Sequence, residues 1–596
     1  MSVLDRIERL RNAMEQQKVD CYIIPTDDYH HSEYVGDYFK FREYITGFTG
    51  SAGTAVFTKD KAGLWTDGRY FIQAEAQLKG SGITLYKSGE SDVPTIEEFL
   101  KSELKEGDVL GFDGRTVTYA QGKRYCHIAD ENGASLKYSL DFAQNIWKER
   151  PEMSMESVFS LADEYTGEKI GSKLERIREI MKENGCNAHV LSSLDDIAWL
   201  LNIRGNDIAY CPLVLSYAIV YNNSVELFAD IRKFSDDIIN LLAENQVKIY
   251  PYEDIYRKVS EMTSEDKLLL DSAIMNYSLY QAISKETVIV DKQNPEILMK
   301  SVKNETQAEN LRKAHLKDAV AHTKFMYWLK KNIGRVEITE LSASARLEGL
   351  RAEQEHFLGP SFGPISAYGE HGAIVHYSAD EKSNVPLKEG KLFMTDTGGH
   401  YLEGSTDITR TVALGEVGNI EKEHFTLVAR AMLRLANTVF LYGCSGANLD
   451  CIAREVFWKE GLNFNHGTGH GVGYLLNIHE GPINFRWKDG ERPAPALEEN
   501  MVITDEPGIY IEGSHGIRLE NELLVRKTVK NEYGQFMNFE ILTYVPIDLD
   551  AILPEKMSTE EKEMLNHYHK QVYEKVSPYL SEEERIWLKE YTRAVK

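Results

Sequence analysis

Most of the chemistry that this sequence offers lies in four stretches: KLFMTDTGGHYLEGSTDITRTVALG (391–415), FNHGTGHGVGYLLNIHEGP (464–482), MVITDEPGIYI (501–511) and HGIRLENELLV (515–525). Within them, four carboxylates and one histidine could form one metal site: Asp396, Asp407, His470, Glu506 and Glu520. An oxygen-rich donor set with a single nitrogen suits hard divalent ions such as Mn²⁺. Four carboxylates at one point would repel each other strongly, whereas two divalent cations would cancel their formal charge. The set therefore favours a two-metal site.

The two aspartates lie in a predicted β-hairpin. Apolar residues precede Asp396, the segment TRTVAL follows Asp407, and glycines between them are expected at the turn. Either aspartate alone could simply be a turn residue. Because both are flanked by apolar strand residues, a functional site is the better interpretation.

Three histidines follow within fourteen residues, surrounded by glycine: His466, His470 and His479. Glycine lets the backbone approach closely and leaves the imidazoles room to point at a ligand. In the last stretch, alternation places Arg518, Glu520 and Glu522 on one face of a strand. A solvent-exposed strand face would show the same alternation, so Glu520 alone is a weak signal.

The order MTDTGG, TDITRT, HGTGHGVG, DEPGIY, IRLENE resembles the "pita-bread" metallopeptidase family of methionine aminopeptidase, prolidase and aminopeptidase P. The chain length, LWTDGRYFIQAEAQL and DDIAWLLNIRGNDI are similar to the three-domain cytosolic aminopeptidase P, also called Xaa-Pro aminopeptidase. The resemblance covers nearly the whole chain. It implies a metal-dependent aminopeptidase that hydrolyses the N-terminal Xaa-Pro bond of peptides whose second residue is proline.

The resemblance also implies roles for the five candidate ligands. Asp396 would bind one metal, Asp407 and Glu520 would bridge both, and His470 and Glu506 would complete the second. Two Mn²⁺ ions per subunit are expected, with Zn²⁺ or Co²⁺ as alternatives. Creatinase, a metal-free relative, lacks the full set, so a metal-free hydrolase is disfavoured.

Further residues match positions that contact substrate or take part in catalysis. His376, in GAIVHYS, and the histidines His466 and His479 match substrate-contacting residues, and Arg69, in TDGRYF, matches one from an N-terminal domain. In the expected mechanism, a hydroxide bridging the two metals attacks the carbonyl carbon before proline. Glu506 would shuttle the proton, and His376 and His479 would donate to the carbonyl oxygen.

The remainder of the chain predicts α/β and α+β architecture. LDRIERLRNAMEQQKVDCYII, from Leu4, resembles LERIREIMKENGCNAHVLS, from Leu174, which indicates two repeated creatinase-like α/β domains. We expect them at 1–152 and 153–299, ahead of a catalytic pita-bread domain at 300–596 with a helical tail from about 550. FREYITGFTGSAGTAVFT (41–58) is predicted as strands with glycine-rich turns, and its GFTGSAG lacks the context of a phosphate-binding loop.

Bulk properties exclude several classes of protein. A net charge of −25 over 596 residues argues against nucleic-acid binding, which needs a basic face. Six sparse cysteines fit reduced thiols, so a cytoplasmic protein is expected. Neither a secretory signal nor an apolar run of about 18 residues occurs, so no membrane association is expected. A homodimer is implied by the family resemblance only.

Three alternatives compete with the aminopeptidase. A prolidase, which cleaves only Xaa-Pro dipeptides, shares the ligand set but usually lacks a second N-terminal repeat. A non-catalytic binding protein on this fold is disfavoured by the intact ligands. A methionine aminopeptidase is disfavoured because those chains are mostly a single catalytic domain.

Overall fold

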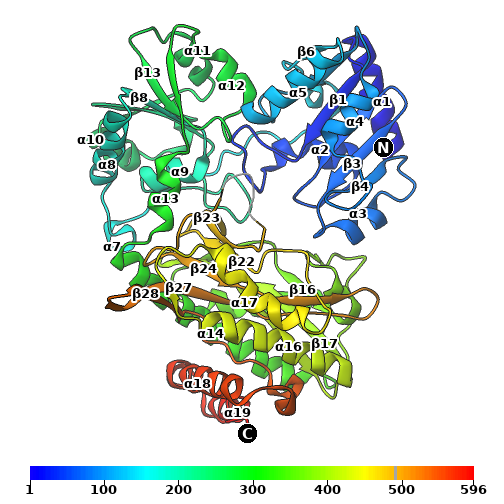
Figure 1. Ribbon diagram of the computed structural model, residues 1–596, viewed down its shortest axis with the longest axis vertical. Coiled ribbons are helices and arrows are strands. Elements are labelled where there is room, and N and C mark those ends of the chain that lie inside the picture. Colours follow the sequence, from blue (N-terminus) through cyan, green and yellow to red (C-terminus); the bar gives the residue numbers. More distant parts are fainter. Residues whose placement is uncertain (489–492) are drawn as a thin grey trace. The chain divides into compact units, whose positions relative to one another are not determined.

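The computed structural model describes residues 1–488 and 493–596 and contains two compact units (Figure 1). The first unit comprises residues 1–161 and 168–296, and the second comprises 162–167 and 297–596. The predicted boundaries at 152 and 299 stay a prediction. Among the described residues, no helix is both long and apolar enough to cross a membrane.

The first unit begins with an α/β repeat built on one mixed sheet in the order β4-β3-β2-β1-β5-β6. A capping box between Ser2 and Asp5 starts its first helix, which buries Ile7, Leu10 and Met14. The elements are α1 (Val3–Gln16), β1 (Cys21–Pro25), η1 (Asp37–Phe39), α2 (Phe41–Thr46), β2 (Thr54–Thr58), β3 (Ala62–Thr66), α3 (Phe71–Gln77), β4 (Thr84–Lys87), α4 (Ile96–Glu103), β5 (Val109–Phe112), α5 (Tyr119–Glu131), β6 (Ser135–Lys137) and α6 (Phe142–Ile146).

The second repeat has the same topology, with the sheet order β12-β11-β10-β8-β13-β14. In both repeats the central strand pairs antiparallel on one side and parallel on the other. The predicted repetition is therefore confirmed. The elements are β7 (Phe159–Ser160), α8 (Ile170–Glu183), β8 (Ala188–Leu191), α9 (Leu194–Leu200), β9 (Ile203–Arg204), β10 (Tyr217–Tyr221), β11 (Val225–Phe228), η2 (Ile231–Lys233), α10 (Asp236–Glu244), β12 (Val247–Tyr250), α11 (Asp254–Ser260), β13 (Lys267–Leu270), α12 (Tyr277–Ala282) and β14 (Val288–Asp291). The next helix, α13 (Pro295–Ser301), begins in the first unit and ends in the second.

The two repeats contact each other through equivalent positions. Thr118, the N-cap of α5, and Asn276, the N-cap of α12, form an isolated β-bridge. Beside this bridge the rings of Tyr119 and Tyr280 stack with their centroids 3.4 Å apart. Because the same point of each repeat meets its counterpart, the contact has the character of a local two-fold relation.

One predicted strand of the first repeat is wrong. Phe41–Thr46 forms helix α2, although its aromatic and β-branched residues favour a strand. Phe41 and Ile45 are both buried, and their i, i+4 spacing places them on one helical face. Gly47, at φ 73°, ends the helix in the left-handed region, which glycine adopts at low cost.

The second unit combines antiparallel sheets with long helices, and its large apolar core lies between them. The long helix α14 packs against α15, and α16 packs against α17. The elements up to the second helix pair are α7 (Asp163–Thr166), α14 (Glu305–Asn332), α15 (Glu340–Ala352), β15 (Phe357–Pro360), β16 (Ile365–Tyr368), η3 (Gly369–Ala373), β17 (Lys391–Thr397), β18 (Gly399–Tyr401), β19 (Gly404–Ser405), β20 (Ile408–Leu414), α16 (Asn419–Ala436), β21 (Phe440–Leu441) and α17 (Gly446–Trp458).

The remaining elements complete the sheets and form the tail. One sheet has the order β16-β17-β20, and another has the order β21-β28-β27-β24-β22-β23. The predicted helical tail packs on this unit, with α18 and α19 against α14 (Figure 1). The elements are β22 (Gly469–Val472), β23 (His479–Phe485), β24 (Val502–Asp505), β25 (Gly508–Ile511), β26 (His515–Arg518), β27 (Asn521–Asn531), β28 (Gly534–Ile541), η4 (Leu549–Ala551), η5 (Pro554–Lys556), α18 (Thr559–Val576), η6 (Ser577–Tyr579) and α19 (Glu582–Tyr591).

The predicted hairpin around the two aspartates is present, but its glycines have two different roles. β17 pairs with β20, so that Asp396 lies opposite Thr409. Gly404, at φ 128°, lies at the turn. Gly398 instead lies where two backbone segments approach closely. A Cβ atom there would be 1.8 Å from the Thr406 carbonyl oxygen.

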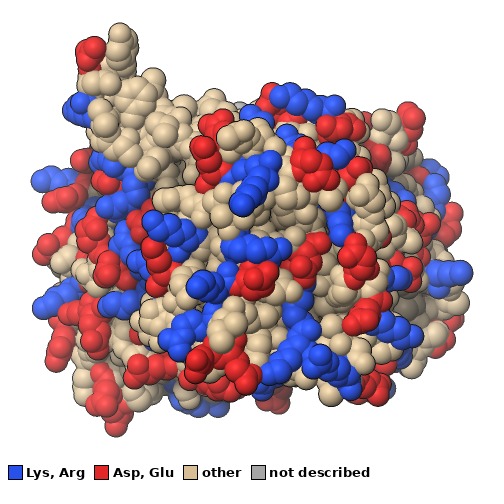
Figure 2. All heavy atoms as spheres, turned by 90° about the horizontal axis from the view of Figure 1, so that it is seen from below, with Lys and Arg blue, Asp and Glu red and all other residues tan. Residues whose placement is uncertain are grey.

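The surface charge is mixed in sign. Figure 2 shows lysine and arginine side chains interspersed with aspartate and glutamate over the face that it draws. On this face, the excess of acidic residues therefore does not gather into a single patch.

Candidate metal centre

Three of the five predicted ligands converge in the second unit. Ligand atoms of Asp407, His470 and Glu520 all lie within 4.8 Å of one another. Asp407 immediately precedes β20, His470 lies in β22, and Glu520 lies between β26 and β27. His470 Nε2 is 3.5 Å from Asp407 Oδ2 and 3.8 Å from Glu506 Oε1, so Glu506 borders the same group.

Asp396 joins the group from the neighbouring strand. Its partner across the hairpin, Thr409, donates a hydrogen bond of 2.8 Å to Glu520 Oε2. Asp396 Oδ2 accepts from Arg518 Nε at 3.0 Å. Asp396 Oδ1 is buried and has no hydrogen-bond partner among the described residues. A buried carboxylate oxygen without a hydrogen-bond partner lowers the stability of the fold unless a ligand such as a cation binds it.

Burial and mutual repulsion dominate the electrostatics of this site. Burial, followed by the charges of Asp396 and Glu522, raises the pKa of Asp407 well above its usual value. Burial, followed by the charges of Asp407 and Glu506, likewise raises the pKa of Glu520. Burial also raises the pKa of Glu506, although His470 and Arg518 oppose that shift. The cluster therefore holds more negative charge than its surroundings neutralise.

The donor set fits a divalent cation. His470 Nδ1 donates to the carbonyl oxygen of Gly471 at 2.9 Å, which leaves the lone pair on Nε2, the atom that faces the carboxylates. Metal-binding histidines commonly use such a bond to fix tautomer and ring orientation. The raised carboxyl pKa values and the unpartnered oxygen of Asp396 are the two features that a bound cation would relieve.

Two further residues, to which the sequence assigned no role, support this cluster. Arg518 contacts Asp396, donates to Tyr510 Oη at 2.7 Å and donates to the Val375 carbonyl oxygen at 3.3 Å. Glu522 Oε1 accepts from the backbone N–H of Asp407 at 2.6 Å. The side-chain alternation did place both residues on the face of Glu520. The exposed-face alternative is wrong, because the exposed fractions of Arg518 and Glu522 are 2% and 0%.

The three predicted substrate histidines lie in different settings around the cluster. The ring of His479 packs edge-on against that of His470, with centroids 4.2 Å apart. His466 Nε2 lies 2.8 Å from Tyr510 Oη, the hydroxyl that also contacts Arg518. His376 follows Val375, whose carbonyl oxygen accepts from Arg518.

Comparison with known proteins matches nearly the whole length of the chain. Residues 309–527 match metallopeptidase family M24, and 535–595 match the C-terminal region of peptidase M24. The Creatinase/Prolidase N-terminal domain matches twice, at 6–137 and 149–307. Xaa-Pro aminopeptidase 1 of Dictyostelium discoideum is 36% identical over 97% of this chain and 94% of its own length. The chain belongs to the M24 metallopeptidases.

Two solved structures place this M24 peptidase within its family. The X-prolyl aminopeptidase of Caenorhabditis elegans, described as a cytosolic enzyme with a di-nuclear active site, is 33% identical. It has a TM-score of 0.95, and the match covers 100% of both chains. The Xaa-Pro dipeptidase of Bacillus anthracis is 25% identical with a TM-score of 0.51, and covers 64% of this chain and 99% of its own. The full-length similarity is therefore to aminopeptidases, which speaks against the prolidase alternative.

Arg69 of this M24 peptidase lies in the first unit. Its guanidinium binds the Asp67 carboxylate through two bonds, 2.9 Å from Nε and 2.8 Å from Nη2. It also lies over the ring of Tyr70, 5.3 Å from the centroid. These contacts hold the side chain in one orientation, and its predicted contact with substrate stays a prediction.

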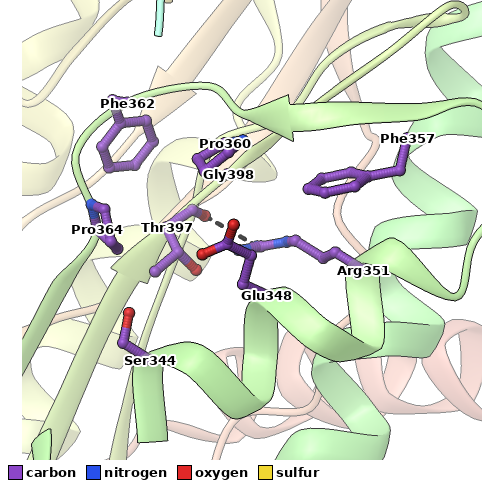
Figure 3. A pocket seen from close by; sticks show the side chains of 9 residues that line it. All are labelled: Ser344, Glu348, Arg351, Phe357, Pro360, Phe362, Pro364, Thr397 and Gly398. Atoms are coloured by element: carbon purple, nitrogen blue, oxygen red, sulfur yellow. Dashed lines mark hydrogen bonds between the residues drawn. The ribbon is translucent and has the colours of Figure 1, made fainter. Parts of the chain in front are cut away.

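A small cavity lies behind the Asp396 hairpin of this M24 peptidase, between α15 and the segment 357–364 (Figure 3). Its volume is about 10 Å³, which is close to the minimum for one water molecule. Arg351 in its wall donates to the Thr397 carbonyl oxygen at 3.1 Å. The cavity is therefore far too small to admit a peptide.

Proposed function

We propose that this M24 peptidase is a metal-dependent aminopeptidase that hydrolyses the N-terminal Xaa-Pro bond of peptides. The observation that carries the proposal is the convergence of Asp407, His470 and Glu520, in a chain similar over its full length to Xaa-Pro aminopeptidases. An intact set of buried donors also argues against a non-catalytic scaffold, because their mutual repulsion serves no structural purpose without a cation.

Two divalent cations per subunit would be held by the five candidate ligands. Asp396 would bind one ion, Asp407 and Glu520 would bridge the pair, and His470 and Glu506 would complete the second. Mn²⁺ is the proposed metal because oxygen donors dominate, with Zn²⁺ or Co²⁺ as alternatives. When bound, the ions supply water activation near neutral pH and stabilise developing negative charge.

The chain's own residues would bind the substrate and move protons. Glu506 would accept a proton from the attacking water and pass it to the proline nitrogen as the bond breaks. His376 and His479 would donate to the substrate carbonyl oxygen as its charge grows. His466, with its Nε2 hydrogen-bonded by the hydroxyl of Tyr510, would contact substrate, as would Arg69. Proline needs such a dedicated site, because its nitrogen carries no N–H and its φ is fixed.

A peptide assay with and without metal tests this function. The protein is treated with chelator, dialysed, and assayed with Arg-Pro-Pro, Gly-Pro and Arg-Ala-Pro before and after addition of Mn²⁺. We expect release of arginine from Arg-Pro-Pro alone, and only after the metal is restored. Cleavage of Gly-Pro without cleavage of Arg-Pro-Pro would instead identify a dipeptidase, and full activity without metal would contradict the proposed site.

We further propose a homodimer located in the cytoplasm. Trp458 and Trp487 are 43% and 45% exposed and pack against each other, with ring centroids 5.8 Å apart. Paired exposed tryptophans favour a protein contact, since this residue type is enriched at interfaces. All six cysteines are free, which fits a reducing compartment. Light scattering should give about twice the chain mass of 67.9 kDa, and a monomeric mass would contradict the dimer.

A further inference from the structure

Glu340, in the first turn of α15, is a buried carboxylate whose partners lie on both sides of His376. Its Oε1 accepts hydrogen bonds of 2.8 Å from the backbone N–H of Tyr368 and from His371 Nδ1. Both donors precede His376 in the sequence. The side chain of Glu340 is fully buried, so water does not compete for these bonds.

The second oxygen of Glu340 binds residues that follow His376. Oε2 accepts from Tyr377 Oη at 2.9 Å and from the backbone N–H of Val385 at 3.3 Å. The backbone of Glu340 joins the same segment, because its N–H donates to the Val385 carbonyl oxygen at 3.2 Å. One side chain thus ties together four positions of the segment 368–385.

The residue directly before His376 is tied to the candidate metal centre. The carbonyl oxygen of Val375 accepts from Arg518, whose guanidinium also binds Asp396. His376 therefore lies between Val375, which Arg518 holds, and Tyr377, which Glu340 holds. A continuous path of contacts runs from Glu340 through this histidine to a candidate metal ligand.

The segment depends on these polar ties because its own apolar core is small. Ile365, Ala367, Tyr377 and Met394 form a cluster separate from the main core. Within the segment, η3 lies directly on β26, and a Cβ atom on Gly516 would come within 1.6 Å of the carbonyl oxygen of the facing residue in η3, Gly372. Such close packing leaves only one arrangement of the segment against the strand that carries Arg518.

We propose that Glu340 is a positioning residue, whose buried carboxylate fixes segment 368–385 so that His376 stays aligned with the metal centre. The inference rests on the proposed function, in which His376 donates to the substrate. Glu340 itself acts through Tyr377 and the neighbouring backbone.

Glu340→Gln is the direct test. A glutamine amide presents N–H groups to two of the four donors, so those bonds are lost while the shape is kept. We expect kcat/KM for Arg-Pro-Pro to fall by about 10- to 100-fold, chiefly through kcat, with bound metal unchanged. Glu348→Gln, an exposed site on the same helix, and Asp548→Asn, a buried carboxylate elsewhere in this unit, should both stay within about twofold.

A double-mutant cycle with His376→Ala separates positioning from general loss of stability. If Glu340 acts through His376, adding Glu340→Gln to His376→Ala should lower kcat/KM by less than about threefold further. Full multiplication of the two effects would overturn the proposal. If His376→Ala alone keeps full activity while Glu340→Gln does not, the proposal is also overturned, although metal-dependent Xaa-Pro cleavage by the natural protein would stand.

Hydrogen exchange gives a measure that does not depend on activity. Peptides from 368–385 should exchange faster in Glu340→Gln, whereas peptides carrying His470 and Glu520 should not change. Tyr377→Phe removes the hydroxyl that donates to Glu340 at 2.9 Å and to the Ser383 carbonyl oxygen at 3.3 Å, and it keeps the ring. It should therefore show the same changes at smaller size if Glu340→Gln fails to fold. Unchanged exchange together with kcat/KM within twofold in the folded variant would overturn the proposal.

Discussion

Two kinds of buried carboxylate lie close together in the second unit, and they differ in what neutralises them. Asp318 accepts from Arg351 at 2.6 Å (Nε) and 3.1 Å (Nη2) and also accepts from the hydroxyl of Thr406. Glu340 likewise has a protein donor at each contact. Asp407 and Glu520 lie among other carboxylates, whose charges add to burial in raising their pKa values.

The difference indicates which carboxylates are structural and which are functional. Where a buried carboxylate serves the fold, the protein neutralises it with a cationic side chain or with several hydrogen-bond donors. At the candidate metal centre the carboxylates carry more negative charge than Arg518 offsets, so a cation from solution would complete the balance. Burial alone does not separate the two kinds, because Asp318 and Glu520 are both almost fully buried.

The largest effect is expected from removing one charge at the candidate metal centre. Asp407→Asn should lower kcat/KM on the order of 10³-fold or more, because the proposed site would lose the ligand that is assigned to both ions. Metal content by mass spectrometry should fall below two ions per chain. Glu348→Gln serves as the control, and an Asp407→Asn protein with near-normal turnover and two ions would contradict the bridging role.

Replacing Asp318, the carboxylate that is paired with Arg351, should instead lower the stability of the fold. Asp318→Asn leaves the buried guanidinium of Arg351 without its counter-ion, and we expect the free energy of unfolding to fall by about 3 kcal/mol. Denaturant unfolding monitored by tryptophan fluorescence measures the change. The folded variant should still bind two metal ions, and loss of both would place Asp318 in the metal centre rather than in the fold.

Metal removal should also distinguish the carboxylates of the candidate metal centre from those that serve the fold. At a free cation concentration of 100 times Kd, binding stabilises the folded chain by about 2.7 kcal/mol for each site, which chelation removes. Asp318→Asn should lose the same amount on chelation, because its defect is independent of the metal. Asp407→Asn should lose much less, and an equal loss in both variants would contradict the assignment of Asp407.

The smallest effect concerns His569, a buried imidazole that the folded protein keeps neutral. Burial, helped by Arg410, lowers the pKa of His569 to about 3. Below pH 6.5 the unfolded chain gains a proton here and the folded chain does not, so stability falls as pH falls, by about 1.4 kcal/mol per unit. His569→Gln should remove one proton from the pH dependence of unfolding between pH 6.5 and 5. An unchanged dependence would show that His569 titrates normally.

Local pattern was enough to predict the repeated α/β architecture and the hairpin around Asp396 and Asp407. Apolar alternation and glycine punctuation act over a few residues, so both can be recognised in one sequence. The same reasoning failed at Phe41–Thr46, because tertiary burial of two residues on a helical face overrode their strand preference.

The supporting residues of the site could not be predicted in the same way. Glu522 meets the backbone of Asp407 across 115 positions of sequence, and Arg518 meets Asp396 across 122. Alternation showed only which face of a strand they occupy. Their partners are determined by strand pairing and sheet packing, and Glu340 carried no motif that would connect it with His376.

The bridge between Thr118 and Asn276 has a consequence for the first unit. As separate molecules, two such halves would come apart on dilution below their dissociation constant. Within one polypeptide the encounter is intramolecular, at an effective concentration on the order of millimolar for a short tether. The paired arrangement is therefore maintained at any cellular abundance of the enzyme, and neither half needs to recruit a second molecule to complete it.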